Sequence, residues 1–242
     1  MQGVTRNPLA EPGLLGVNAG AALAVVGAIF LLGIDSPREY VWFAFLGAGL
    51  AAAAVHSLGS GGRDAASPVR LVLAGAVMSS LLVALTSAIL VIDVDTLDQY
   101  RFWVVGSLAG RDLSVLADVA PFMVAGIAIA LLSGRSLGQR VGLTRGLAAL
   151  AVVLLAGASV AAAGPIAFVG LAVPQGVRMI VGADWRWVLA YSAAVGPILL
   201  IGSDILGRVV ARPGEVQVGV MTALIGAPVF VLLARRRRPA AA

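Results

Sequence analysis

Long apolar runs alternate with short polar tracts along the whole chain. A helix that crosses a bilayer needs about 20 mostly apolar residues, and seven runs approach or exceed this length: 14–34, 40–58, 69–92, 113–133, 146–163, 187–206 and 216–234. An eighth run, 165–182, is shorter and contains Pro165, Gly170, Pro174 and Gly176. These breakers predict a bent or partly re-entrant helix buried among others. The pattern predicts an all-α polytopic membrane protein with about eight transmembrane helices.

The composition supports this class. Hydrophobic residues make up 60% of the 242 residues and charged residues 12%, and the mean hydropathy is +1.00, which excludes an ordinary soluble domain. The net charge is +5, but the arginines lie in short tracts between apolar runs instead of on one basic face, so we expect no nucleic-acid partner. The chain has no Cys, which excludes disulfides and thiolate metal sites, and no cofactor is expected.

The distribution of arginine predicts an orientation in the membrane. With eight spans, alternate loops can be compared by the rule that cytoplasmic loops are rich in Arg and Lys. One side contains twelve arginines, Arg6, Arg63, Arg70, Arg135, Arg140, Arg145, Arg178, Arg186 and Arg235 to Arg238, and the other contains Arg38, Arg101, Arg111, Arg208 and Arg212. We therefore expect both termini in the cytoplasm and the chain in a bacterial cytoplasmic membrane.

The chain offers little for enzyme chemistry. All 17 basic residues are Arg, so there is no Lys to complete a phosphate-binding P-loop. No Ser-His-Asp set or His-Glu metal motif is present, and the single histidine, His56, is interpreted as an interfacial polar residue. The sequence predicts a transport protein instead of an enzyme.

One apolar tract could line a transport pathway. Residues 163–174 are broken by Gly164, Pro165, Gly170 and Pro174, so the freed backbone groups need partners inside the protein or in a cavity. Broken helices of this kind often mark transport pathways. A packing kink without any contact to cargo is the alternative, and the residues alone do not decide between them.

Several motifs together resemble the FecCD family of importer permeases. The first is Gln2-Gly3-Val4-Thr5-Arg6-Asn7-Pro8-Leu9-Ala10-Glu11-Pro12, followed by Leu15-Gly16-Val17 and Gly20-Ala21. The pattern continues through residues 70–75, 102–108, 163–171 and 219–228. The resemblance covers nearly the whole chain.

The resemblance implies a fold, partners and cargo. Members are ten-helix subunits that pair as homodimers or heterodimers, bind cytoplasmic ATPase subunits, and receive iron–siderophore, haem or vitamin B12 from an extracytoplasmic substrate-binding protein. For this chain it implies a single transmembrane permease domain over residues 1–242. ATP hydrolysis would then reside on a partner chain.

The resemblance also assigns residues to roles. The family motif contributes Arg6, Asn7, Pro8, Leu9, Ala10 and Pro12; the bend of the translocation pathway contributes Gly164, Pro165, Gly170, Pro174 and Gln175; the ATPase side contains Arg135, Arg140, Arg145 and Arg178; and Arg208 and Arg212 would meet the binding protein.

Three departures from the family pattern bear on activity. The chain begins at the first motif, so the family's first two helices are expected to be missing. The cytoplasmic segment near 133–145 is shortened, with only Ser133-Gly134 between Leu132 and Arg135. Gln175 stands where the family usually has His. Two alternatives therefore stay open: a secondary transporter or channel that works without ATP, and an inactive truncated remnant of a permease.

Overall fold

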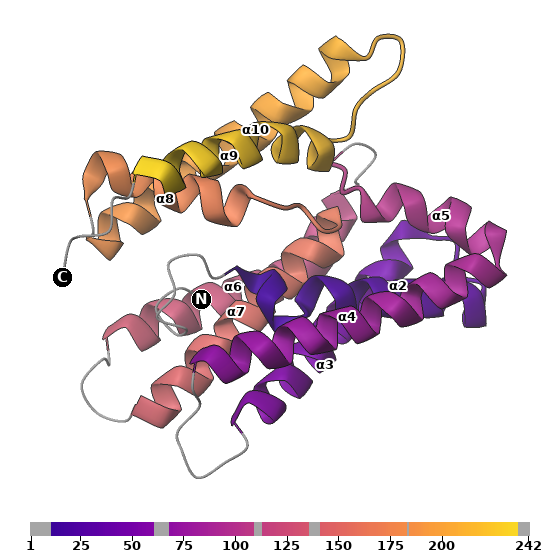
Figure 1. The fold of residues 1–242 in the computed structure, drawn as a ribbon, viewed down its shortest axis with the longest axis horizontal. Coiled ribbons are helices and arrows are strands. Elements are labelled where there is room, and N and C mark those ends of the chain that lie inside the picture. Colours follow the sequence, from indigo (N-terminus) through magenta and orange to yellow (C-terminus); the bar gives the residue numbers. More distant parts are fainter. Residues whose placement is uncertain (1–10, 61–67, 109–112, 136–140, 183, 237–242) are drawn as a thin grey trace. The chain divides into compact units, whose positions relative to one another are not determined.

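The computed structural model describes residues 11–60, 68–108, 113–135, 141–182 and 184–236, and every regular element in this part is a helix (Figure 1). The elements are the 3₁₀ helix η1 (Pro12–Leu15) and the α-helices α2 (Val17–Leu32), α3 (Pro37–Ser60), α4 (Pro68–Ile92), α5 (Val94–Val104), α6 (Leu113–Arg135), α7 (Val141–Ala163), α8 (Val169–Val181), α9 (Trp185–Val210) and α10 (Val218–Arg236). The expected all-α class is confirmed.

The chain forms two compact units. The first consists of residues 1–104 and 111–164 and includes η1 and α2 to α7; the second consists of residues 105–110 and 165–242 and includes α8 to α10. Each unit has its own cluster of buried apolar side chains, so each is described by itself.

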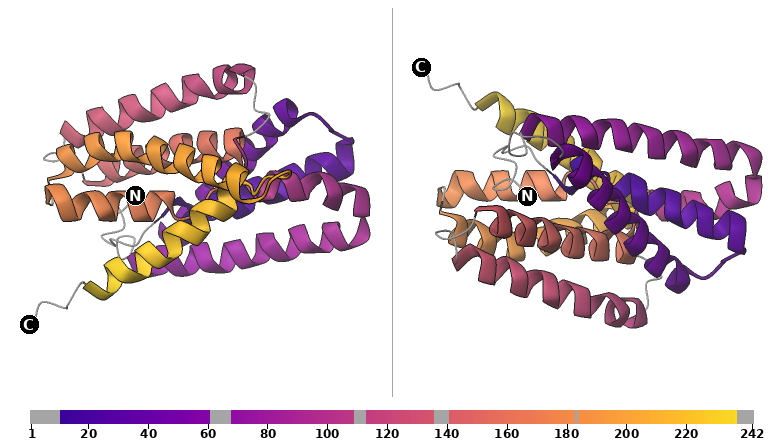
Figure 2. Two further views of the ribbon diagram at one scale, coloured as in Figure 1. Left: turned by 90° about the horizontal axis from the view of Figure 1, so that it is seen from above. Right: turned by 90° about the horizontal axis from the view of Figure 1, so that it is seen from below.

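Small residues bring the helices of the first unit close together. A Cβ atom added to Gly20 of α2 would collide with the backbone oxygen of Gly47 on α3, and one added to Gly47 would collide with the oxygen of Gly20. Such small residues allow two backbones to approach closely in lipid, where close packing replaces the hydrophobic driving force. The helix α4 lies beside both α2 and α3 (Figure 2).

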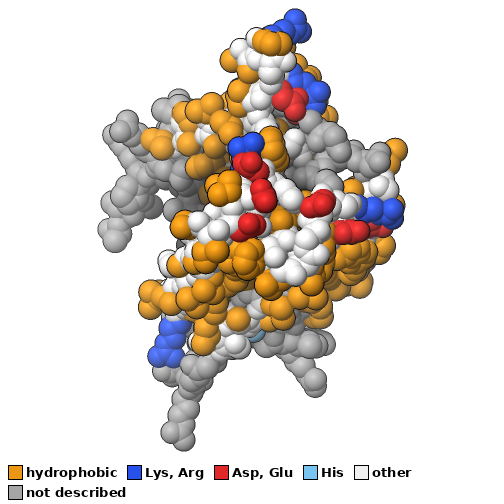
Figure 3. All heavy atoms as spheres, turned by 90° about the vertical axis from the view of Figure 1, so that its right-hand side faces the viewer, with side chains coloured by type: hydrophobic (Ala, Val, Ile, Leu, Met, Phe, Trp, Pro, Cys, Tyr) orange, Lys and Arg blue, Asp and Glu red, His pale blue; other side chains and the backbone are white. Residues whose placement is uncertain are grey.

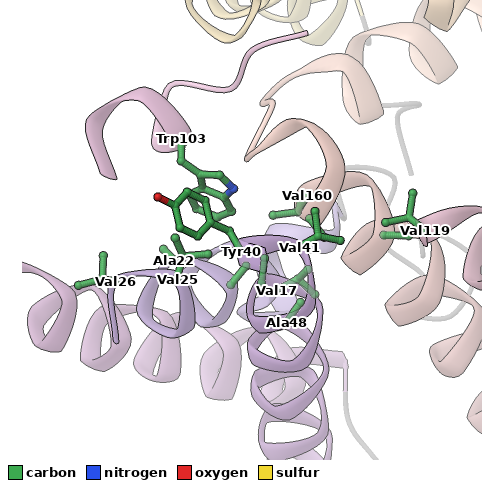
Figure 4. Packing of buried hydrophobic residues seen from close by; sticks show 14 of the residues in the cluster. Val17, Ala22, Val25, Val26, Tyr40, Val41, Ala48, Trp103, Val119 and Val160 are labelled. Atoms are coloured by element: carbon green, nitrogen blue, oxygen red, sulfur yellow. The ribbon is translucent and has the colours of Figure 1, made fainter. Parts of the chain in front are cut away.

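The buried core of the first unit consists mainly of Val and Ala side chains. Val17, Val25 and Val41 are almost completely buried, and the larger rings of Tyr40 and Trp103 belong to the same cluster (Figure 4). Because these small side chains fill narrow spaces, the core tolerates few changes in volume.

The second unit is held by similar close approaches. A Cβ atom on Gly207 of α9 would collide with the backbone oxygen of Val216, which lies between α9 and α10. A Cβ atom on Gly226 of α10 would lie 2.6 Å from Cβ of Phe168. Val173 of α8 packs with Val188 of α9. The glycines thus fix how closely α8, α9 and α10 pack.

Each long apolar run forms a helix, but the number of spans stays a prediction. In the described part, five helices are long and apolar enough to cross a membrane: α3, α4, α6, α7 and α9. The apolar helices α2, α8 and α10 are shorter. The 13 residues of α8 extend about 20 Å, which is less than the hydrocarbon thickness of about 30 Å.

The structure departs from the predicted pattern at α5. The polar tract after residue 93 gave no prediction of a helix, yet residues 94–104 are helical. The Asp93 carboxylate accepts a hydrogen bond from the backbone N–H of Thr96 at 2.9 Å, which satisfies a free donor at the helix start. Thr96, Tyr100 and Trp103 form its buried face, and burial raises the pKa of Tyr100 to about 12.

We predict that Gly47→Ala destabilises the first unit by about 1–3 kcal/mol, because the added methyl group must push α2 away from α3. The matched control is Gly27→Ala in α2, where an added Cβ meets nothing within 4 Å and a better helix former is introduced. Thermal unfolding in detergent compares the two variants. Equal melting temperatures would contradict the proposed role of the contact.

Candidate functional site

The break between α7 and α8 is the first candidate element. Gly164, which closes the first unit, has φ of 77° and donates its N–H to the oxygen of Val160 at 2.8 Å. Pro165 begins the longer segment of the second unit, and α8 begins only at Val169. The predicted run 165–182 therefore starts with a non-helical segment, because Pro165 lacks an N–H and the left-handed Gly164 turns the chain away from the helix axis.

Phe168 adopts a backbone conformation that is unusual for its type. Its φ is 68°, and it is the one non-glycine residue with positive φ in the described part of the chain. This left-handed conformation costs about 1–2 kcal/mol for a residue with a Cβ. It is held in place because the Phe168 oxygen accepts hydrogen bonds from the N–H groups of Leu171 and Ala172, at 3.1 and 2.7 Å. Phe168 thereby starts α8.

The segment before α8 packs within the second unit against two glycines. A Cβ atom on Gly106 would lie 3.0 Å from the oxygen of Pro165 and 3.0 Å from Ile166 Cγ1. The Gly106 oxygen accepts a hydrogen bond from the N–H of Gly219 at 3.2 Å. The start of α10, the 105–108 segment and the approach to α8 therefore meet at one point.

The remaining residues of the predicted bend lie on α8 with different exposures. Gly170 is exposed, Pro174 is half-buried within the helix, and Gln175 is only 6% exposed. Burial of a polar amide among apolar helices is costly without hydrogen bonds, and Gln175 does take part in an interaction. The structure thus places these three residues on one helix, with Gln175 on its inner side.

The predicted docking arginines lie at the end of α9. Arg208 Nε donates to Asp204 Oδ2 at 2.9 Å, one turn away on the same helix, and the two side chains are 51% and 22% exposed. Arg212 follows the helix and is exposed. Asp204 and Arg208 therefore form an ion pair within one helix, and both arginines are exposed on the second unit.

The other residues with predicted roles lie at helix ends or outside the described part of the chain. Pro12 begins η1, and Arg178 is half-buried in the last turn of α8. Arg135 ends α6, and Arg145 lies in the first turns of α7. Arg6, Asn7, Pro8, Leu9, Ala10 and Arg140 lie outside the described residues.

A polar network in the first unit was not predicted from the sequence. The Arg38 guanidinium on α3 donates to both oxygens of Asp118 on α6, at 2.8 and 3.3 Å. Tyr40 donates to Gln99 Oε1 at 3.1 Å, and Gln99 Nε2 donates to Asp35 Oδ1 at 3.0 Å. These bonds tie α5 and α6 to the start of α3. On the face in Figure 3, acidic and basic side chains gather beside one another among hydrophobic ones.

Two features of the described residues argue against a metal site and against ion coupling. They contain no group of three or more His, Asp or Glu side chains arranged to hold a metal ion. Asp118 and Asp204, which could otherwise couple transport to an ion, are each paired with an arginine.

Comparison with known proteins decides the family. The model of the FecCD transport family matches residues 1–236. The chain belongs to the FecCD transport family. It is 45% identical to the siderophore transport system permease protein YfiZ of Bacillus subtilis, over 98% of this chain and 75% of that protein. It is also 45% identical to the ferric enterobactin transport system permease protein FepD of Escherichia coli, with the same two coverages.

A solved structure agrees with this assignment. A metal-chelate type ABC transporter in an inward-facing conformation superposes with a TM-score of 0.84 at 30% identity, over 97% of this chain and 80% of that one. Membership of the FecCD family confirms the expectations of a membrane-located transport protein and of a subunit that is not an enzyme. The roles assigned to individual residues stay predictions.

We predict that Gly226→Ala destabilises the second unit of this FecCD protein by about 1–3 kcal/mol, because the new Cβ would lie 2.6 Å from Cβ of Phe168. Gly170→Ala is the matched control on α8, since an added Cβ there meets nothing within 4 Å. Melting of the purified proteins in detergent gives the comparison. Equal melting temperatures for Gly226→Ala and Gly170→Ala would show that the contact with Gly226 does not hold Phe168 in place.

Proposed function

We propose that this chain is the permease subunit of an ABC importer that moves an iron–siderophore or a related metal chelate across the cytoplasmic membrane. The observation that carries the proposal is the similarity to two siderophore-system permeases, each 45% identical over 98% of this chain. The ferric citrate permease YfmD of Bacillus subtilis, 41% identical over the same share, supports a chelated ferric ion as the cargo.

We propose the partners that such a permease requires. They are a second permease subunit, as a homodimer or heterodimer, cytoplasmic ATPase subunits and an extracytoplasmic substrate-binding protein. The missing P-loop lysine supports a separate ATPase, because this chain has no Lys to complete a nucleotide site. The whole chain would act as one transmembrane permease domain, with no nucleic-acid partner.

The arginine distribution supports an orientation with both termini in the cytoplasm. In this orientation the end that carries Arg38, Asp118 and the helix α5 faces outward. Arg135, Arg140, Arg145 and Arg178 would lie toward the ATPase, and the bend from Gly164 to Gln175 would border the pathway. The motif residues Arg6, Asn7, Pro8, Leu9, Ala10 and Pro12 would lie at the cytoplasmic entry of the first span of this chain.

The proposal is tested by uptake of a radioactive ferric siderophore into cells that lack their own permease and express this chain with an ATPase subunit and a binding protein. We expect uptake that requires all three components and stops when the ATPase is inactivated. Uptake driven by a proton gradient without ATP would refute an ABC importer. Failure of the purified chain to associate with any ATPase subunit of its operon would refute it as well.

We predict that Arg208→Glu lowers uptake at least tenfold by weakening contact with the binding protein, while changing stability by no more than about 0.5 kcal/mol, because an exposed pair within a helix contributes little. Arg101→Glu is the matched control, since Arg101 pairs with Asp98 at 2.9 Å, three residues away, and the Arg101 side chain is 58% exposed against 51% for Arg208. Uptake and binding-protein affinity are measured together. Equal losses of uptake and of binding-protein affinity in the two variants would contradict a docking role for Arg208.

A further inference from the structure

An apolar groove opens on the first unit among η1, α3, α4 and α7. Its volume is about 300 Å³, at the lower end of the range of about 300–1,000 Å³ for ligand pockets. Gly49, Ala53 and His56 of α3 form one wall, and Leu71 of α4 and Val153 of α7 face it. His56 is the one lining residue with a polar side chain, so the groove suits an apolar ligand.

The groove is bordered by helices that are long and apolar enough to cross a bilayer. Three of its walls belong to candidate membrane spans, Arg38–Gly59, Val69–Ile92 and Gly146–Ala163. Ala53 and Leu150 line it and are exposed, so it is open to its surroundings. Water would find too few hydrogen-bond partners on such walls, whereas the hydrocarbon around the spans is chemically matched to them.

One end of the groove is basic. His56 lies one turn before Gly59, and a Cβ atom on Gly59 would lie 3.1 Å from Cα of Leu71. Arg70, which directly precedes Leu71 at the start of α4, is exposed, as is His56. The ends of α3 and α4 thus lie close together, with His56 lining the groove and the exposed Arg70 next to the lining residue Leu71. In the orientation proposed above, on which this inference rests, this end would face the cytoplasmic leaflet, which is rich in anionic lipid.

We propose that this groove binds one anionic phospholipid, with an acyl chain along Gly49, Ala53 and Val153 and the phosphate beside His56 and Arg70. Charge decides the class of lipid, because the guanidinium of Arg70 at the headgroup end favours a net anionic phosphate over a zwitterionic headgroup, and the His56 imidazole can donate a hydrogen bond to that phosphate. A metal chelate fits these walls poorly, because such cargo needs several polar partners and the groove has a single polar side chain. The inference is independent of the transported cargo.

The test measures lipid binding to the purified full chain by native mass spectrometry, with phosphatidylglycerol and phosphatidylcholine of the same acyl chains. We expect one phosphatidylglycerol to bind at least tenfold more tightly than phosphatidylcholine. The variant His56→Gln/Arg70→Gln should remove this preference and leave weak binding of both lipids. Equal affinity of the unchanged protein for the two lipids would overturn the proposal.

A second variant tests the acyl-chain site. An added Cβ on Gly49 meets only Val153 Cγ1, at 3.9 Å, so Gly49→Leu fits but fills the groove and should lower phosphatidylglycerol affinity at least tenfold. Gly27→Leu is the matched control, because Gly27 has nothing within 4 Å of an added Cβ; melting temperatures verify that both variants fold. Equal affinity in the two variants would show that the lipid binds elsewhere.

Discussion

The structure depends on one constraint, that a backbone inside hydrocarbon must satisfy its own hydrogen bonds. Helices meet this requirement within themselves, so the described chain is helical, but they then gain little from burying apolar surface against one another. Close packing has to replace that gain. Small residues allow this close packing at two places. Gly20 contacts Gly47, and Gly75 lies against the backbone of Leu14.

The same constraint explains how the chain tolerates a break at Gly164 to Phe168. The ends of the two helices are closed locally: Gly164 donates to Val160, and the Phe168 oxygen accepts from Leu171 and Ala172. The left-handed conformation of Phe168 is the cost of starting α8 at this point, and Gly226 leaves room for its Cβ. A strained residue that is fixed by its neighbours at a broken helix is typical of functional segments, which is consistent with a place beside a transport pathway.

The sequence predicted those features of the structure that follow from a local pattern of residues. Long apolar runs predicted the positions of the main helices. The helix α5 was missed because Asp95, Asp98 and Arg101 on its outer face lower the mean hydropathy of the tract, although Thr96, Tyr100 and Trp103 follow helical spacing. The pair of Arg38 and Asp118 is 80 residues apart in the chain, so no local pattern reveals it. The motifs that resembled the FecCD family identified it correctly, because they preserve a specific order of Gly, Pro and polar residues.

The two arginine–aspartate pairs differ in what they can do. Arg38 and Asp118 belong to different helices, so their bond joins the start of α3 to α6, beside the ring contacts of Trp42 and Phe45 with Phe122. Arg208 and Asp204 lie on one helix, where an exposed pair contributes only about 0.3–0.5 kcal/mol and positions no second element. Arg208 can therefore exchange Asp204 for a carboxylate of another protein at little cost in stability. A docking residue needs this property, whereas Arg38 is suited to hold the outer end of the first unit together.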